Sequence, residues 1–188
     1  MFKKEMACLD GTKVLLREPK RSDAKECMRM INEMADEPNI GIVASNRVTL
    51  QEEKAWLKGV LNAIKKKQKV MLLIEYKGRI RGNSSIELRR PGTKEAHCGV
   101  FGITIGRELR GKGVAQQLIP FLISMAKKRL RGLEIIELEV FHTNDMARHV
   151  YEKLGFRKVA VIPNKIKTKS GKHINSVVMQ KYVKKIRT

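Results

Sequence analysis

Hydrophobic residues recur along this 188-residue chain with two different spacings. Short apolar runs bounded by Gly and Pro predict strands, and apolar residues three and four positions apart predict helices. Strands are predicted at residues 12–18, 70–76, 79–88, 96–106, 135–141, 156–162 and 175–182. Helices are predicted from residue 23 to a loop at 36–41, from a capping box at 49–52 to residue 64, after Gly113, and at 144–154.

This order of elements, βααβββαβαββ, predicts one α/β (α+β) domain over residues 1–188. Strands joined by short glycine-containing turns should pair antiparallel. Strand 135–141 follows strand 96–106 through a helix, so that pair should be parallel. We therefore expect a mixed, mostly antiparallel central sheet flanked by helices.

Two of the predicted helices carry further expectations. In the helix that follows residue 49, the apolar positions predict a buried face made of Trp56, Val60, Leu61 and Ile64. The helix after Gly113 contains Pro120, which has no backbone N–H and should kink it.

A glycine-rich basic loop joins a strand to a helix within residues 102–125. The N–H groups in the first turn of a helix have no intrahelical partner, and the helix dipole makes that end partly positive, so phosphate binds there. Gly111 and Gly113 allow close approach because they have no Cβ. Positive charge surrounds the loop at Arg107, Arg110 and Lys112. We call this loop, residues 107–113, the cradle. It predicts a binding site for a diphosphate.

A nucleotide-binding P-loop is one alternative for the cradle. Gly106 to Lys112 satisfies the G-x-x-x-x-G-K part of that motif. The next residue, however, is Gly113, where a Ser or Thr hydroxyl should bind Mg²⁺, and strand 135–141 ends without the Asp that would hold the metal. An ATPase lacking both magnesium ligands is disfavoured, and no metal site is expected.

The second alternative is a coenzyme A site. Arg110-Gly-Lys-Gly-Val-Ala115 resembles the R/Q-x-x-G-x-G/A signature of the GNAT superfamily of N-acetyltransferases. A second segment, residues 140–156, resembles that family's strand, its helix with Asn144 and Tyr151, and its closing Gly-Phe. The two segments lie in the family's order along the chain. The chain is therefore similar to this family in fold and in both motifs.

The resemblance implies an enzyme that transfers an acetyl group from acetyl-CoA to a primary amine by direct attack. The family binds the diphosphate of coenzyme A on the cradle, here Arg110, Gly111, Lys112, Gly113, Val114 and Ala115. It also implies that the strand at Ile103, Thr104 and Ile105 binds the pantetheine amides and stabilises the oxyanion, and that Asn144 binds the pantetheine arm. Tyr151 would protonate the leaving thiolate as general acid.

The sequence leaves the general base and the acceptor open. Glu75, Glu87 and His97 all lie on strands expected beside the cleft, and we place Glu87 slightly ahead, with a water relay as the alternative. The resemblance implies that the pair of helices before residue 64 and the loop between them shape the acceptor pocket, and residues 41–46 in that loop are the candidate rim. The acceptor can be a protein or peptide amine or a small-molecule amine, and a non-catalytic coenzyme A-binding module would share every cradle feature.

Composition adds one competing hypothesis. With 40 Lys and Arg against 19 Asp and Glu, the formal net charge is +21, which favours anionic partners such as nucleic acid or the ribosome. Aromatic residues make up only 5%, and no nucleic-acid motif is present. Three widely spaced cysteines and the lack of a long apolar run predict a cytoplasmic protein with no membrane partner. The sequence does not predict the oligomeric state.

Overall fold

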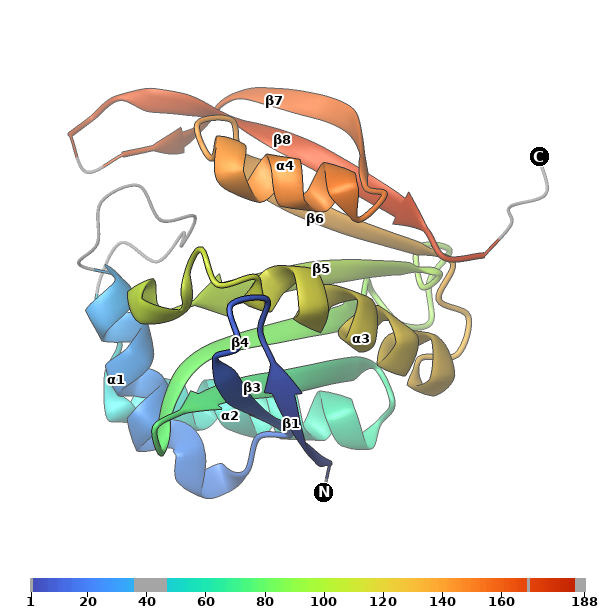
Figure 1. The fold of residues 1–188 in the computed structure, drawn as a ribbon. Coiled ribbons are helices and arrows are strands. Elements are labelled where there is room, and N and C mark those ends of the chain that lie inside the picture. The colour runs from blue at the N-terminus through green and yellow to red at the C-terminus, as the bar shows by residue number, and fades with distance from the viewer. Residues whose placement is uncertain (1, 36–46, 169, 185–188) are drawn as a thin grey trace.

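The computed structural model describes residues 2–35, 47–168 and 170–184, which form one mixed sheet with helices on both faces (Figure 1). The sheet order is β1-β2-β3-β4-β5-β6-β8-β7, and among the described residues only β5 and β6 pair in parallel. The strands are β1 (Lys3–Ala7), β2 (Lys13–Arg17), β3 (Lys69–Tyr76), β4 (Arg79–Leu88), β5 (Cys98–Ile105), β6 (Ile135–Phe141), β7 (Arg157–Lys167) and β8 (His173–Tyr182).

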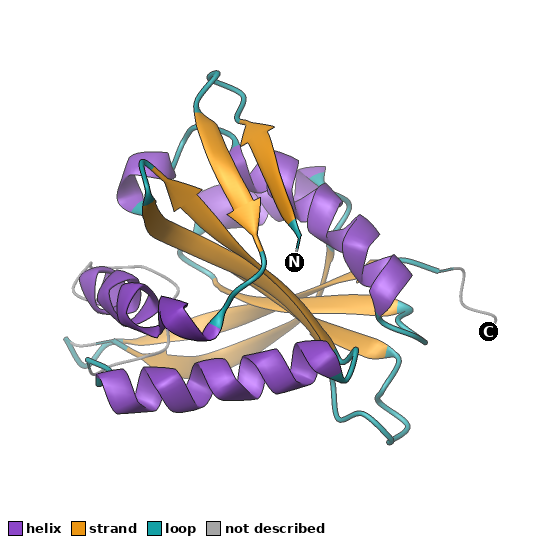
Figure 2. Ribbon diagram, turned by 90° about the horizontal axis from the view of Figure 1, so that it is seen from below, coloured by secondary structure: helices purple, strands orange, loops and turns teal. Residues whose placement is uncertain are grey.

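The helices divide between the two faces of the sheet (Figure 2). They are α1 (Ala24–Ala35), α2 (Leu50–Lys65), α3 (Val114–Arg129) and α4 (Asp145–Lys153), with short 3₁₀ turns η1 (Arg21–Asp23) and η2 (Arg107–Leu109). One apolar core lies under α3 and α4, and a smaller one lies under α1 and α2. No helix in the described part of the chain is long and apolar enough to cross a membrane.

The predicted fold class and the order of the predicted elements are confirmed, with one added strand. Strand β1 pairs with β2 at the sheet edge, and every one of its residues except Met6 is exposed. Its sequence, KKEMA, has no apolar alternation, so the strand is held by backbone bonds to β2 and was not predictable from periodicity. The sheet therefore has eight strands, of which the sequence predicted seven.

Trp56 was predicted to lie on the buried face of α2. This prediction is wrong, because 42% of the Trp56 surface is exposed. Val60 is buried as predicted, and Leu61 and Ile64 are partly buried against the same core. Leu57 is buried in place of Trp56, and with Glu53 and Val60 it forms one helix face of positions three and four residues apart. Trp56 lies one position, about 100°, away from Leu57. In α3 the helix continues through Pro120 as far as Arg129.

The feature that matters most for function is the incomplete pairing of β5 with β6. Three pairs join the strands, from Cys98 opposite Ile135 to Val100 opposite Glu137, and then the strands diverge (Figure 1). On its other side, β5 remains paired with β4 as far as Ile105. Alternate residues between 101 and 105 therefore present backbone groups to an opening in the sheet where β6 would otherwise bind them.

Candidate functional site

The divergence of β5 and β6 creates a cavity of about 670 Å³ beside the first turn of α3. Its walls come from β4, β5, β6, the cradle and α4. Ten of the twelve residues predicted for the site line it, namely Ile103, Thr104, Ile105, Arg110, Gly111, Gly113, Val114, Ala115, Asn144 and Tyr151. The fold thus brings the two motif segments together around one space.

The cradle has the geometry of an anion site. Gly111 and Gly113 have φ values of 73° and 78°, a left-handed conformation that side chains with a Cβ rarely adopt. Helix α3 begins at Val114 without an acidic residue in its first turn, and its first backbone bond runs from the Gln117 N–H to the Gly113 carbonyl at 3.2 Å. The N–H groups of the first turn, from Val114 to Gln116, are therefore available to phosphate oxygens at the cavity wall.

Lys112 belongs to the cradle, but its side chain is directed elsewhere. Its ammonium lies 2.8 Å from Asp10 Oδ2, in the turn between β1 and β2, and its carbonyl accepts a bond from the Leu9 N–H at 3.0 Å. A Cβ added to Gly113 would lie 2.4 Å from Leu9 Cγ. The β1–β2 turn therefore packs against the back of the cradle, and Lys112 does not line the cavity.

The segment leading into the cradle is fixed from β4. The Gly106 N–H donates to the Arg81 carbonyl at 2.7 Å, and the Arg110 Nε donates to the Ile105 carbonyl at 2.9 Å. Leu109 between them is almost completely buried. These contacts hold the cradle against the end of β5 and fix its position relative to that strand.

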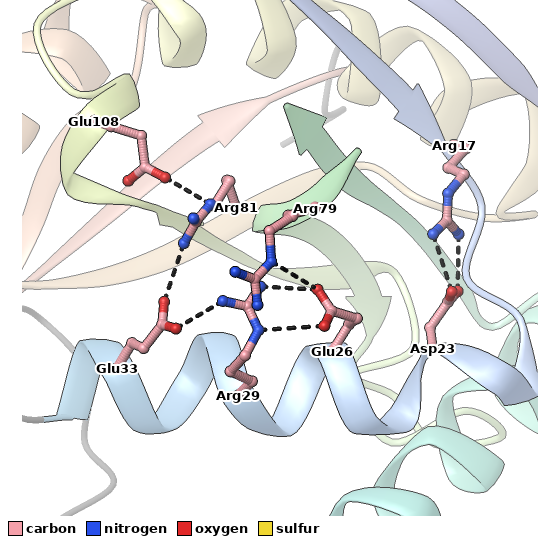
Figure 3. Close-up of polar contacts among 8 residues, drawn as sticks. All are labelled: Arg17, Asp23, Glu26, Arg29, Glu33, Arg79, Arg81 and Glu108. Atoms are coloured by element: carbon pink, nitrogen blue, oxygen red, sulfur yellow. Dashed lines mark hydrogen bonds and ion pairs between the residues drawn. The ribbon is translucent and has the colours of Figure 1, made fainter. Parts of the chain in front are cut away.

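The Arg81 side chain links the cradle to α1 (Figure 3). It pairs with Glu108 in η2 at 2.7 Å and with Glu33 in α1 at 3.0 Å. Glu33 also pairs with Arg29 at 2.7 Å, and Arg29 in turn pairs with Glu26 at 2.8 Å. Helix α1 precedes the predicted acceptor rim at residues 41–46, which lies outside the described residues. The network thus connects the cradle to α1.

Tyr151 lies in a cluster of three aromatic rings. Its ring centroid is 6.0 Å from that of Phe101 and 5.9 Å from that of Phe156. Only 8% of its surface is exposed, and burial raises the pKa of its hydroxyl to about 12. The hydroxyl therefore stays protonated at neutral pH, in the state that can donate a proton.

Asn144 is the N-cap of α4 and also lines the cavity. Its Oδ1 accepts from the Ala147 N–H at 3.1 Å. Among the described residues its amide Nδ2 has no hydrogen-bond acceptor, so the donor half of the side chain is left for a ligand. Capping and ligand binding are compatible at this residue.

The structure does not bring the three predicted base candidates to the cavity. Glu87 pairs with Lys69 at 2.8 Å, Glu75 pairs with Arg17 at 2.8 Å, and the half-buried His97 has its Nδ1 3.0 Å from the Lys94 carbonyl. None of the three lines the cavity.

Glu139 on β6 is the acidic residue among those that line the cavity. Its two oxygens each lie 2.6 Å from Lys165 Nζ, and Ser176 Oγ donates to Oε2 at 3.0 Å. Burial opposes its charge, but the bonds from Lys165 and Ser176 outweigh that effect and hold the pKa of Glu139 below its usual value. The signal in the sequence was the alternation of buried Leu138 and Val140 with Glu139, which places the carboxylate on the opposite face.

Comparison with known proteins identifies the family. The sequence pattern of the family described as "Acetyltransferase (GNAT) family" matches residues 29–156, more than half of the chain. The chain belongs to the GNAT acetyltransferase family. The match includes the cradle, β5, β6, Asn144 and Tyr151, and it ends at Phe156 of the aromatic cluster.

Individual relatives match only about half of this chain. The chain is 36% identical to a [ribosomal protein bS18]-alanine N-acetyltransferase of Haemophilus influenzae, over 45% of this chain and 56% of that protein. It is 31% identical to the L-amino acid N-acetyltransferase AaaT of Escherichia coli, over 54% of this chain and 61% of that one. These matches span little more than half of the relatives' lengths.

A solved GNAT-type structure confirms the fold over nearly the whole chain. The acetyltransferase yncA from Salmonella typhimurium, described with its cofactor acetyl-CoA, superimposes with a TM-score of 0.78. The alignment covers 93% of this chain and 96% of that one at 18% sequence identity. At this identity the similarity establishes the fold alone.

Proposed function

We propose that this GNAT protein is an acetyl-CoA-dependent N-acetyltransferase that acetylates a primary amine. The observation that carries the proposal is the single cavity in which the cradle, the open edge of β5, Tyr151 and Glu139 meet. Both relatives compared above are named N-acetyltransferases, and the solved neighbour is described with acetyl-CoA. Those names are consistent with the chemistry of this cavity.

The chain's own groups account for binding of the acetyl donor. The first-turn N–H groups of α3 and the Arg110 side chain face the position of a diphosphate. The unpaired edge of residues 103–105 can exchange backbone bonds with the pantetheine amides, as a neighbouring strand would. The Nδ2 group of Asn144 can donate a further hydrogen bond to the pantetheine arm. Bound acetyl-CoA supplies an activated thioester, so that the protein needs only to orient it and manage protons.

Three groups manage the transfer. Glu139, charged at neutral pH, attracts the ammonium of the acceptor and takes its proton through water. Backbone N–H groups of residues 103–105 stabilise the oxyanion that forms when the amine attacks the acetyl carbon. Tyr151 donates its proton as the carbon–sulfur bond breaks. Glu87, the base favoured by the sequence, is replaced in this scheme because its carboxylate lies outside the cavity.

The acceptor is proposed as a class, a primary amine of a peptide, an amino acid or another small molecule. The acceptors named for the two relatives, a ribosomal-protein alanine and L-amino acids, fall within this class. A net charge of +21 disfavours polycationic acceptors, because the field of the protein repels them.

Isothermal titration with acetyl-CoA, with ATP·Mg²⁺ and a short RNA as comparators, tests the donor site. We expect acetyl-CoA to bind with a dissociation constant in the micromolar range or below, followed by release of free thiol when a panel of peptide and small-molecule amines is added. Thiol release without any acetylated amine would point to hydrolysis. Binding of RNA without acetyl-CoA would contradict the proposal and favour a nucleic-acid-binding protein, which the charge of +21 makes the second candidate.

A further inference from the structure

Lys165 occupies an unusual place beside the cavity. It lies on β7, two strands away from Glu139 on β6, with β8 between them. The pairing of β7 with β8 shifts between Ile162 and Ile166, and Asn164 within that shift has a left-handed φ of 52°. Such irregularities redirect side chains. Here the Lys165 ammonium reaches across β8 and lies 2.6 Å from each oxygen of Glu139.

The bulge is itself held in place. The Asn164 N–H donates to Asn175 Oδ1 at 3.0 Å, from the facing strand β8. Ser176, the next residue on β8, donates to the same Glu139 carboxylate. Lys165 is therefore presented to Glu139 by a supported backbone conformation.

Among the described residues, Lys165 is the one lysine that forms an ion pair with a residue lining the cavity, and that residue is Glu139. The other lysine–carboxylate pairs, Lys13 with Glu5, Lys69 with Glu87 and Lys112 with Asp10, use carboxylates that do not line the cavity. An ammonium bound to Glu139 occupies the place where the proposed function puts the amine of an acceptor. Lys165 is thus positioned as an internal acceptor.

We propose that Lys165 is a self-acetylation site, modified by the same chain's acetyl-CoA; this inference rests on the proposed function. Lys165 Nζ gives a proton to Glu139, directly or through water, and attacks the acetyl carbon. A nitrogen–carbon bond forms and the carbon–sulfur bond breaks. The leaving thiolate takes the Tyr151 proton, the second proton of the nitrogen returns through water to Tyr151 as the amide forms, and Glu139 releases the first proton to solvent. The products are N-acetyl-Lys165, free coenzyme A and one proton, with no oxidant or metal required.

Acetylation changes the acceptor side of the cavity. N-acetyl-Lys165 has no charge and cannot maintain the ion pair, so Glu139 keeps only the Ser176 hydrogen bond among its present contacts. The pKa of Glu139 then rises toward its ordinary value, because the Lys165 bond and charge both lower it now. The modified protein therefore offers a stronger base and an open carboxylate to an external amine.

The experiment incubates the purified protein with acetyl-CoA and no added amine, and locates acetyl groups by peptide mass spectrometry over time. Lys165 should be acetylated before Lys13, which is the control for non-enzymatic acetylation because it is more exposed and paired with a distant carboxylate. Glu139→Gln and Tyr151→Phe should each slow labelling of Lys165 about 100-fold. Labelling of Lys13 should be unchanged in both variants.

Titration calorimetry on the same samples separates two kinds of failure. Acetyl-CoA binding with no preferential label on Lys165 would overturn the self-acetylation site and leave the donor site intact. No binding would overturn the proposed function, and this inference with it. The first-order rate of Lys165 labelling should be independent of protein concentration, and a rate proportional to concentration would refute transfer within one chain. Lys165→Arg, which keeps the charge, should lose this label alone.

Discussion

At the scale of single residues, the site depends on two ionisable groups that the fold treats in opposite ways. Burial raises the pKa of the Tyr151 hydroxyl, and hydrogen bonds from Lys165 and Ser176 lower the pKa of the Glu139 carboxylate. The two groups line one cavity from different elements, α4 and β6. At neutral pH, one is therefore in its proton-donating form and the other in its proton-accepting form, as acetyl transfer requires.

Replacing Tyr151 by Phe tests the proton donor. The variant keeps the ring contacts with Phe101 and Phe156 but loses the hydroxyl. We expect kcat to fall about 100-fold with little change in the dissociation constant for acetyl-CoA. Because the pKa of Tyr151 is about 12, the wild-type rate should not decline where an ordinary tyrosine ionises, near about pH 10. Steady-state rates over pH, together with calorimetry, check both statements, and equal turnover in the two proteins would remove Tyr151 from the mechanism.

Glu53 predicts a pH-dependent stability. It is buried in α2, and burial raises its pKa to about 7 from 4.5. The folded state thus holds this proton more tightly than the unfolded state, so the contribution of Glu53 is complete below about pH 4.5 and is lost as the pH rises through 7.

Glu53→Gln should therefore stabilise the protein by about 1 kcal/mol above neutral pH, after allowance for solvent screening, and much less at about pH 5. Thermal unfolding at about pH 5 and about pH 8 measures the difference. Glu52→Gln is the control, because the pKa of Glu52 is lowered by its bonds to the Thr49 backbone and side chain. That variant should lose stability at the higher pH, and the same sign in both variants would contradict the assignment.

Residue identity was predictable from sequence where a motif fixes it. The cradle glycines, Asn144 and Tyr151 were placed by spacing and resemblance, and all line the cavity. Glu139 was missed because sequence shows only which strand carries a carboxylate and which way it alternates. Sequence does not show whether the strand separates from the next strand at the position of that carboxylate, because this depends on how the whole sheet is assembled. Glu87 lies on β4 opposite Val100, where β5 still pairs with both of its neighbours, whereas Glu139 lies on β6 beyond its last pair with β5.

At the scale of elements, periodicity predicted the helices and inner strands, because each buries a regular apolar face. It failed for β1, which buries little and depends on backbone pairing with β2. Trp56 shows a second limit, since a neighbouring position on the helix determines which apolar residue meets the sheet. The partial pairing of β5 with β6 had no local signal, because it is a relation between two strands that lie about thirty residues apart in the chain.

The Arg81 bridge predicts that α1 and the cradle are coupled. Arg81→Gln removes the ion pairs with both Glu108 and Glu33. We expect acetyl-CoA binding to weaken by about 1 kcal/mol, or about fivefold in dissociation constant, with kcat less affected. Arg79→Gln is the matched control on the same strand, because Arg79 pairs with Glu26 at 3.7 Å and not with η2. Equal losses in the two variants would show a general charge effect and contradict a specific bridge.

At the scale of the whole molecule, the net charge of +21 creates a field that the pairwise contacts do not reveal. Coenzyme A carries several phosphate charges, so this field should accelerate its encounter with the protein. The same field accounts for the alternative of a nucleic-acid partner. Composition predicted this property fully, since net charge does not depend on the fold.

The association rate of acetyl-CoA should therefore depend on salt. We expect it to fall about tenfold between about 50 mM and about 500 mM monovalent salt, while the dissociation rate changes much less. Stopped-flow measurements of both rate constants test this, with the uncharged acetyl-pantetheine fragment as control. An association rate that does not respond to salt would mean that the surplus charge faces away from the cavity.

The opening between β5 and β6 also bears on solubility. Within the described residues, the β5 edge from 101 to 105 has no strand partner on the β6 side. An unpaired edge in the middle of a sheet is a template to which an extended segment of another molecule can add, which is how aggregation starts. A ligand that occupies this edge closes the template. Under the proposed function, bound acetyl-CoA would therefore protect this edge from such pairing as well as supply the acetyl group.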